Sequence, residues 1–407
     1  MSTSALSGLK VIDCTHVIAG AYCSMLLADL GADVVKVEPL GGENDRAHAT
    51  SAFRAFDSAN RNKRAIAVDL QKPEGAEVIR QLARSADVLV ENFRPGVYDR
   101  LGLGYEALRA VNPRLVYCSI SGFGHSGPYR DRGGFDLVAQ AMSGIMSFTG
   151  EIGSARPVAA GVPISDVAAG CFGALGVLAA LNHRHATGLG QKVEASLLES
   201  ALSFALWETA LYFATGEVAA PRGSRHRLAA PYEALKTADG FIAVGVTSQR
   251  LWIRFCAALE AADLEVEPRF ATPAARVAHR DALQERLEAI LAERPTADWL
   301  QRLLARGVPC GPVNSIAQAL ADPQIAARGL LAEVGGQQFL RAPVLLSETP
   351  VALRRGAARV GEHTHAVLAE HGFGEDAFKR LVEIGAIGVD VVRSSSGDSE
   401  IANATSL

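Results

Sequence analysis

The first third of the chain alternates short apolar runs with longer amphipathic segments. The apolar runs are typical of buried strands and lie at residues 9–13, 33–38, 65–69, 88–91 and 115–120. Helical patterns occupy intervals between them, at 21–30, 75–85 and in a short stretch that ends at Ala110. Strands separated by helices predict βαβ units, and therefore a parallel sheet covered by helices on both faces.

The remaining sequence predicts a second, smaller unit. A mostly helical region from about Asp136 to Phe213 is followed by a basic turn, Arg222–Arg227. A strand at 241–245 and helices at 249–262 and 279–292 then precede the segment 307–313. A strand over 351–359 and a helix over 362–371 are expected to rejoin the first sheet. We therefore predict a Rossmann-like large domain over 1–215, a small inserted α/β domain over 216–328, a return to the large domain over 329–392, and a flexible tail over 393–407.

Composition and charge narrow the possible classes of protein. Of the 407 residues, 49% are hydrophobic and 21% are charged, which is typical of a globular protein. A net charge of -4 gives no general affinity for nucleic acid or for an anionic membrane. We expect neither a signal peptide nor a membrane span. Six scattered cysteines without metal-ligand spacing predict reduced thiols, no metal site and a cytoplasmic location.

One carboxylate stands alone in an apolar stretch. Asp166 is the only charged residue between Pro157 and Leu181. Burying an unpaired carboxylate is costly, so a functional role is one explanation. The other is an N-cap for a buried helix that begins at Val167. The two are compatible, because a helix N-terminus would hold the carboxylate ionised, and an ionised, poorly solvated carboxylate is a nucleophile.

Polar residues flank two of the predicted strands. Asn60–Arg64 precedes the third strand, Glu91–Gly96 follows the fourth, and Arg100 lies one turn further on. We expect these groups at the carboxyl edge of the sheet, where Arg, Lys and Asn suit phosphates and an adenine edge; the alternative is a solvated loop. The chain has no G-x-G-x-x-G fingerprint after its first strand, which disfavours a nicotinamide dehydrogenase.

Several segments, taken in order, resemble the class III CoA-transferases, the family of formyl-CoA transferase and the carnitine-type CoA-transferases. The segments that carry the resemblance, between about Leu6 and Leu368, are LSGLKVIDCTHVIAGAYCSMLLADLGADVVKVEP, NKRAIAVDL, ADVLVENFRPGV, SGFGHSGPYRDRGGFD, GVPISD, GLGQKVEASLLESA, VPCGPVNSIAQALADPQ and GEHTHAVL. The resemblance implies an interlocked homodimer. Each chain would form an open ring, with a Rossmann-like domain made from both chain ends and a small domain inserted between them.

The resemblance also implies a site and a reaction. The family's nucleophilic aspartate falls on Asp166, and its CoA contacts fall on His16, Lys63, Arg64, Asn92 and, for the pyrophosphate, Arg100. Coenzyme A thioesters would be the substrates, with no metal and no permanently bound cofactor. Asp166 would form a mixed anhydride and then an aspartyl-CoA thioester. Backbone N–H groups at the start of the helix after Asp166 are candidates to stabilise the oxyanion.

Two alternatives stay open. α-Methylacyl-CoA racemases share the fold but place a histidine base before the aspartate of a Gly-His-Asp motif. Here Phe135 precedes Asp136, and a phenylalanine cannot carry the α-proton, which favours a transferase. We interpret Asp136 as a structural carboxylate. The second alternative is a non-catalytic protein that binds CoA or a nucleotide.

The sequence indicates the family more strongly than it indicates the donor and acceptor acids. Ile18 replaces the glutamine of formyl-CoA transferases, and no glycine-rich lid is evident at 246–249, which argues against a formyl/oxalate pair. Arg46, Arg225 and His226 are candidates to bind the distal carboxylate of a dicarboxylic acid; the alternative is that they are solvated. We expect a C4–C5 dicarboxylate such as malate, citramalate, mesaconate or itaconate, with succinyl-CoA as donor.

Overall fold

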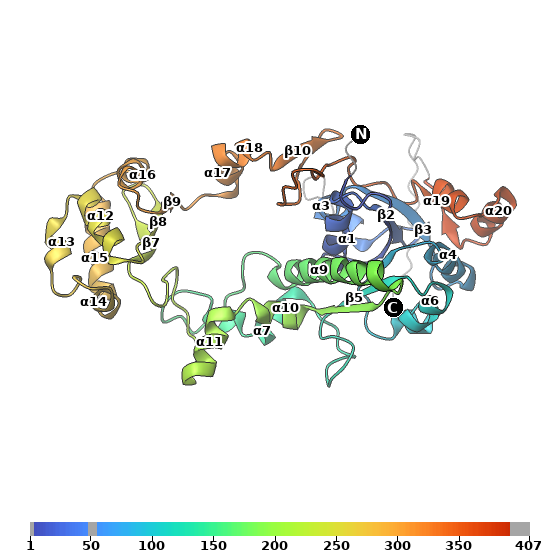
Figure 1. Cartoon of the computed structure of the whole chain (residues 1–407), viewed down its shortest axis with the longest axis horizontal. Helices are drawn as coiled ribbons and strands as arrows, with labels where there is room; N and C mark the ends of the chain where they lie inside the picture. The colour runs from blue at the N-terminus through green and yellow to red at the C-terminus, as the bar shows by residue number, and fades with distance from the viewer. Residues whose placement is uncertain (1–3, 48–54, 391–407) are drawn as a thin grey trace. The chain divides into compact units, whose positions relative to one another are not determined.

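The computed structural model describes residues 4–47 and 55–390, and these residues fall into two compact units (Figure 1). Unit 1 contains the chain up to Ser143, Val162–Phe204 and the part that follows Gly329. Unit 2 contains Gly144–Gly161 and Ala205–Gly329, so it includes more of the chain than the small domain expected over 216–328. The expected tail over 393–407 lies outside the described residues.

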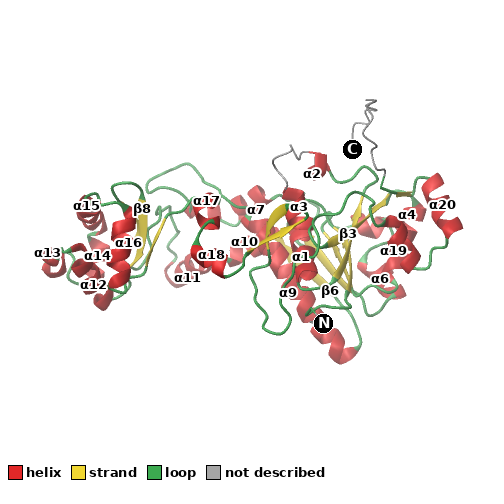
Figure 2. Cartoon of the chain, turned by 90° about the horizontal axis from the view of Figure 1, so that it is seen from above, coloured by secondary structure: helices red, strands yellow, loops and turns green. Residues whose placement is uncertain are grey.

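A seven-stranded sheet forms the centre of unit 1, in the order β12-β3-β2-β1-β4-β5-β6 (Figures 1 and 2). Its strands are β1 (Lys10–Cys14), β2 (Asp33–Glu38), β3 (Lys63–Val68), β4 (Val88–Glu91), β5 (Val116–Ser121), β6 (Lys192–Ser196) and β12 (Ile387–Gly388). β1 to β6 are parallel, as predicted for the first five, and β12 pairs antiparallel with β3. The short β6 was missed, because it lies in a stretch whose pattern is otherwise helical.

The sheet is buried on both faces because successive residues of each strand enter different cores. Ile12, Val35 and Leu89 belong to one core, whereas their neighbours Val11, Val34 and Val88 belong to the other. This explains the continuous apolar runs in the sequence. The helices of unit 1 are α1 (Ala19–Asp29), α2 (Asn44–Ala47), α3 (Ala55–Asn60), α4 (Pro73–Ala83), α5 (Val97–Arg100), α6 (Tyr105–Val111), α7 (Asp136–Met142), α9 (Ile164–Thr187), α10 (Leu197–Ser203), α19 (Thr364–Glu370) and α20 (Glu375–Glu383).

The strand predicted over 351–359 is wrong. These residues have no regular structure, although a separate hairpin, β10 (Leu331–Val334) and β11 (Gln337–Leu340), precedes them. The Asn62 side chain accepts from the backbone N–H groups of Arg354 and Arg355, and the Asn62 backbone donates to Arg355. The segment is therefore held by side-chain contacts, of which those to Asn62 are one set, and not by a ladder of strand hydrogen bonds.

Unit 2 has a separate core. Its antiparallel sheet, in the order β7-β8-β9, contains β7 (Tyr232–Lys236), β8 (Phe241–Gly245) and β9 (Cys310–Pro312). Trp252, Phe255 and Trp299 are buried between this sheet and the helices. The helices of unit 2 are α8 (Ile145–Phe148), α11 (Leu206–Thr215), α12 (Gln249–Leu259), α13 (Ala262–Val266), α14 (Pro273–Ala278), α15 (Arg280–Leu291), α16 (Thr296–Ala305), α17 (Ile316–Leu320) and α18 (Pro323–Ala327).

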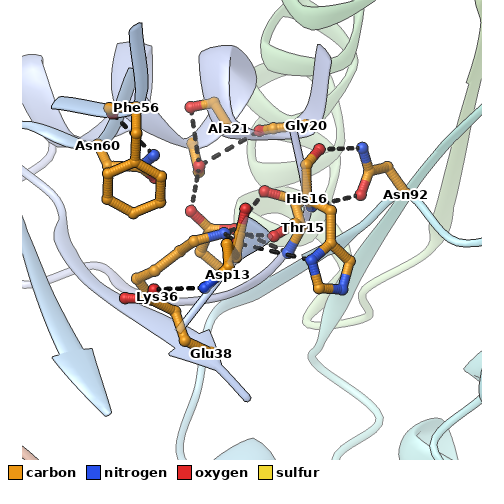
Figure 3. Close-up of polar contacts among 12 residues, drawn as sticks. Asp13, Thr15, His16, Gly20, Ala21, Lys36, Glu38, Phe56, Asn60 and Asn92 are labelled. Carbon is orange, nitrogen blue, oxygen red and sulfur yellow. Dashed lines mark hydrogen bonds and ion pairs between the residues drawn. The ribbon is translucent and has the colours of Figure 1, made fainter. Parts of the chain in front are cut away.

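Four charged side chains are buried at the carboxyl end of β1, and we call Asp13, Lys36, Glu43 and Lys63 the buried charge cluster. Figure 3 shows two of them, Asp13 and Lys36. The Asp13 carboxylate accepts from Lys63 Nζ at 2.8 Å and lies 3.8 Å from Lys36 Nζ. Lys36 also contacts Glu43 and the carbonyl of Thr15. Burial alone would raise the pKa of Asp13, but Lys36 and Lys63 outweigh it and hold that pKa well below its usual range.

Removing the charge of Asp13 tests this cluster. Asp13→Asn should lower the free energy of unfolding by about 3–5 kcal/mol, because it leaves the buried Lys63 ammonium without its carboxylate and Lys36 with Glu43 alone. Urea denaturation at pH 7 measures the change. The control is Asp33→Asn, whose side chain is 46% exposed in its pair with Arg64, and which should cost about 1 kcal/mol or less. Equal losses for the two variants would contradict the role given to the cluster.

Candidate active site

A cavity of about 530 Å³ opens at the carboxyl edge of the unit 1 sheet. Open α/β sheets bind their ligands at this edge. The cavity is lined by the ends of β1, β2 and β3, the segments that follow them, the turn after β4, and α5. The residues that line it are Cys14, His16, Val37, Glu38, Pro39, Leu40, Val68, Asp69, Leu70, Gln71, Phe93, Val97, Tyr98 and Leu101.

His16 lines this cavity, and Asn92 is hydrogen-bonded to its backbone; both are predicted CoA contacts (Figure 3). The His16 backbone N–H donates to Asn92 Oδ1, and Asn92 Nδ2 donates to the His16 carbonyl, each at 2.7 Å. The imidazole packs edge-on against Phe93 with ring centroids 4.6 Å apart. Burial, with the Lys36 cation nearby, lowers the pKa of His16 to about 4, so the ring is neutral at physiological pH.

The first loop, Thr15–Ile18, is held in a strained conformation. Val17 has φ of +59°, a left-handed conformation that is rare for a β-branched residue. Such backbone strain is kept only where surrounding contacts impose it, and the two hydrogen bonds of Asn92 do so here. A Cβ on Gly20 would lie 2.5 Å from Thr15 Cγ2, so the chain needs glycine where α1 turns beneath the loop.

Lys63 and Arg64, two of the predicted CoA contacts, do not line the cavity. Lys63 is 1% exposed, and its Nζ donates to Asp13, Asn60 and the carbonyl of Ala21. Arg64 donates to Asp33 and Glu370. The expected place of Asn60–Arg64 at the carboxyl edge is wrong, because this segment precedes its strand and so begins at the amino end, whereas Glu91–Gly96 follows its strand.

Arg100 remains a candidate for the pyrophosphate. It is exposed at the end of α5, the helix whose residues Val97 and Tyr98 line the cavity.

The three residues proposed for a substrate carboxylate already have partners. Arg46 donates to both oxygens of Glu38, at 2.6 and 2.7 Å, and lies over the ring of Phe56. In unit 2, Arg225 donates to Glu233, Asp281 and Gln284. His226, also in unit 2, packs between the rings of Trp207 and Tyr232. The two guanidinium groups are therefore committed to carboxylates within the chain, which does not support an open anion site at either.

Asp166 is not the N-cap of its helix, which corrects the sequence interpretation. α9 begins at Ile164, with Pro163 at the cap position, and Asp166 is its third residue. The cap comes from another helix: Asp136, at the start of α7, accepts from the N–H of Ser165 at 2.8 Å and of Asp166 at 3.4 Å. A carboxylate beside these N–H groups is favoured by the helix dipole.

The start of α9 therefore has no N–H group left for an oxyanion. Ile164 donates to the carbonyl of Val162, and Val167 donates to that of Pro163. Together with the two bonds to Asp136, these contacts satisfy all four N–H groups of the first turn. The expected oxyanion donors at this position are thus already occupied.

The carboxyl of Asp166 is destabilised as an anion. Burial raises its pKa, the negative charge of Asp136 raises it further, and the result is about 7. The expectation that the helix N-terminus would hold this carboxylate ionised is not supported, because Asp136 accepts from the N–H groups there.

Close packing between α9 and α1 brings Asp166 near the first loop. A Cβ on Gly170 would lie 2.7 Å from the carbonyl oxygen of Ala19, the first residue of α1. Asp166 precedes Gly170 by one helical turn, about 6 Å along the axis. α9 is also long and apolar enough to span a membrane by length and composition alone, but one of its faces packs on α1, β5 and β6.

Some residues of the site were missed in the sequence, although a signal was present. Pro39 and Leu40 directly follow β2, and Asp69, Leu70 and Gln71 directly follow β3, where the carboxyl-edge rule places ligands. Gln140, which donates to Asp136, carried no such signal.

The sequence matches the model of CoA-transferase family III over residues 6–364. It is 38% identical to the succinate–glutarate CoA-transferase of Agrobacterium fabrum, over 90% of this chain and 95% of that protein. It is 36% identical to the beta subunit of the succinyl-CoA–L-malate CoA-transferase of Chloroflexus aurantiacus, over 91% and 94%. A crystal structure of a CaiB/BaiF family protein from Brucella suis superposes with a TM-score of 0.84, at 36% identity, over 91% of this chain and 100% of that one.

The raised pKa of Asp166 predicts a pH-dependent stability difference. Between the ordinary pKa of 3.8 and about 7, the folded chain holds a proton that the unfolded chain has lost, so this group destabilises the fold as pH rises. Asp166→Asn should therefore be roughly 2–4 kcal/mol more stable than the wild type at pH 8, with no advantage near pH 4.

Urea denaturation at several pH values measures this difference. The exposed Asp376 on α20 supplies the control Asp376→Asn, which should stay within about 0.5 kcal/mol at each pH. Lower stability of Asp166→Asn at pH 8 would contradict the raised pKa.

Proposed function

This chain belongs to CoA-transferase family III, and from that membership and its site we propose that it moves CoA from succinyl-CoA to a C4–C5 dicarboxylic acid. The chain is a CoA-transferase, and its substrates are CoA thioesters and carboxylic acids. Relatives that span nearly its whole length are named for succinate and glutarate and for succinyl-CoA and L-malate. Glutarate is a C5 dicarboxylate and malate a hydroxylated C4 dicarboxylate, which supports the acids expected from the sequence.

Asp166 is the proposed nucleophile, and the observation that carries this assignment is its partly buried carboxyl with a raised pKa near the first loop. An Asp166 oxygen attacks the thioester carbonyl of succinyl-CoA and expels the CoA thiolate, forming a mixed anhydride. The thiolate attacks the aspartyl carbonyl, expels succinate and leaves an aspartyl-CoA thioester. The acceptor carboxylate then attacks that thioester and expels the thiolate, which attacks the acceptor's acyl carbonyl and frees Asp166.

The cavity is the proposed site for the nucleotide end of CoA. Leu40, Leu70 and Tyr98 offer apolar walls for a base, and the exposed Arg100 offers a cation for the pyrophosphate. The first loop, clamped by Asn92, then lies between this cavity and α9. Pantetheine following the loop would bring the thioester towards Asp166.

Three helices of unit 1 that contact one another carry exposed apolar side chains, which supports a homodimer interlocked as the family resemblance implies. The exposed apolar side chains on α7, α9 and α10 are Leu137, Val138, Met142, Phe172, Leu175 and Leu202. Exposed apolar patches mark protein interfaces. All six cysteines are free thiols, which supports a reducing compartment such as the cytoplasm.

The nucleophile is tested by trapping. Wild-type protein incubated with succinyl-CoA and hydroxylamine should acquire a hydroxamate on Asp166, read by mass spectrometry of the peptide. Asp166→Ala should acquire none and should lose at least about 1,000-fold in transfer rate, because no covalent intermediate forms. Asp376→Ala is the matched control and should react like the wild type. Transfer by Asp166→Ala at the control rate would refute the assignment.

The acids are tested with a panel. Succinyl-CoA is the donor, and the acceptors are glutarate, malate, citramalate, mesaconate and itaconate. These dicarboxylates should form CoA thioesters about 10-fold or more faster than monocarboxylates of equal length. A site that binds the second carboxylate leaves its own polar group unpaired when a monocarboxylate is bound. Liquid chromatography with mass spectrometry reads the products. A 2-methylacyl-CoA in deuterated water without an acceptor acid should gain no α-deuterium; rapid gain would instead indicate a racemase.

A further inference from the structure

We infer that Asp136 is a positioning residue that prepares Asp166 for attack by occupying the N–H groups at the start of α9, so that none stabilises the Asp166 carboxylate. The inference rests on the proposed role of Asp166 as nucleophile. Asp136 itself does not touch the substrate in this account. It acts only through the helix and through its charge.

The geometry assigns separate tasks to the two oxygens of Asp136. Oδ1 accepts from the backbone N–H of Ser165 at 2.8 Å and of Asp166 at 3.4 Å. Oδ2 accepts from Gln140 Nε2 at 2.7 Å, one turn further along α7. Gln140 is 1% exposed, so this donor is fixed in place. Both oxygens of Asp136 thus accept hydrogen bonds from the chain itself, and neither is left to attack an acyl group.

An acidic residue in the first turn of a helix is ordinarily favoured as an anion by the free N–H groups and the helix dipole. Here the carboxylate that gains this stabilisation is Asp136, and Asp166 is left with a like charge beside it. A carboxylate that is poorly stabilised as an anion gains more by bonding to a carbonyl carbon. Asp136 therefore caps the helix, and Asp166 is left to act as the nucleophile.

The charges on the elements packed against α9 do not offset this effect. Asp29 on α1 pairs with Arg61, Lys192 on β6 pairs with Glu194, and Glu199 on α10 bonds Ser196. The remaining titratable groups on α1 and β5 are Tyr22, Cys23, Tyr117 and Cys118. Burial raises the pKa of Tyr22 and of Tyr117, and the neighbouring Cys118 together with burial raises the pKa of Cys23, so these three groups are neutral near pH 7. Within the described part of the chain, burial and Asp136 are the two influences on the Asp166 carboxyl.

Asp136→Asn tests the inference with little change of shape. The amide oxygen can still accept from Ser165, and Gln140 can turn its own amide to match, but the negative charge is lost. We expect the acid limb of kcat/KM for succinyl-CoA to move down by about 1 pH unit or more, because the like charge beside the nucleophile is gone. At pH 8 kcat should fall about 10-fold or more, with KM within about 3-fold, because only the attacking step is weakened.

Three controls separate positioning from a purely structural role. Asp136→Glu keeps the charge and should restore the acid limb towards the wild-type pH. Asp376→Asn removes an exposed carboxylate on α20 and should leave the profile unchanged. Gln140→Leu removes the donor to Oδ2 and leaves every residue of α9 in place, and it should lower kcat with KM unchanged. It also provides the test if Asp136→Asn does not fold.

An acid limb of Asp136→Asn that coincides with that of the wild type would overturn the inference, as would wild-type kcat in Gln140→Leu. Failure of the proposed function is distinguished by hydroxylamine trapping. If Asp166 is not labelled in the wild type, the nucleophile assignment fails. If Asp166 is labelled and the Asp136 variants behave as the wild type, only the positioning role fails.

Discussion

The site depends on a set of buried charges at the end of β1. Asp13 has no solvent contact and is kept ionised by Lys36 and Lys63, which are themselves buried in apolar strands. Lys36 also contacts the carbonyl of Thr15, the first residue of the first loop. Because an unpaired charge at this depth is very costly, the loop cannot shift without disturbing the whole cluster. The buried charges of the core thus hold in place the first loop, which lines the cavity.

The loop built on this base is held from its other side by Asn92. The amide side chain bonds both the N–H and the carbonyl of His16, which leaves Val17 in a left-handed conformation. Strain of this size, about 1–3 kcal/mol, persists only when stronger contacts impose it. α1 then begins at Ala19 against the backbone of α9, where Gly170 permits the approach. Buried charge, strained loop and helix contact therefore form one continuous support between the cavity and Asp166.

Asp136 and Asp166 meet at the start of α9 and carry the same carboxyl group in different surroundings. Asp136 receives the backbone donors and the amide of Gln140, and so is stabilised as an anion. Asp166 is partly buried and lies beside the negative charge of Asp136, so its pKa rises to about 7. This difference supports the proposal that Asp166, and not Asp136, is the nucleophile.

The sequence by itself determined the parallel sheet and the family, because strand runs that are apolar on both faces and ordered motifs are properties of the chain alone. Asp166, His16 and Asn92 stay predictions of the site: Asp166 stands alone in an apolar stretch, Asn92 follows a strand at its carboxyl end, and His16 comes from the family resemblance. The tertiary structure alone decided that Lys63 and Arg64 lie away from the cavity, that residues 351–359 are held by side chains such as Asn62 and Arg46 without forming a strand, and that Asp136 and not Asp166 caps α9. Each of these outcomes depends on partners tens to hundreds of residues away in sequence, and no local pattern encodes such a pairing.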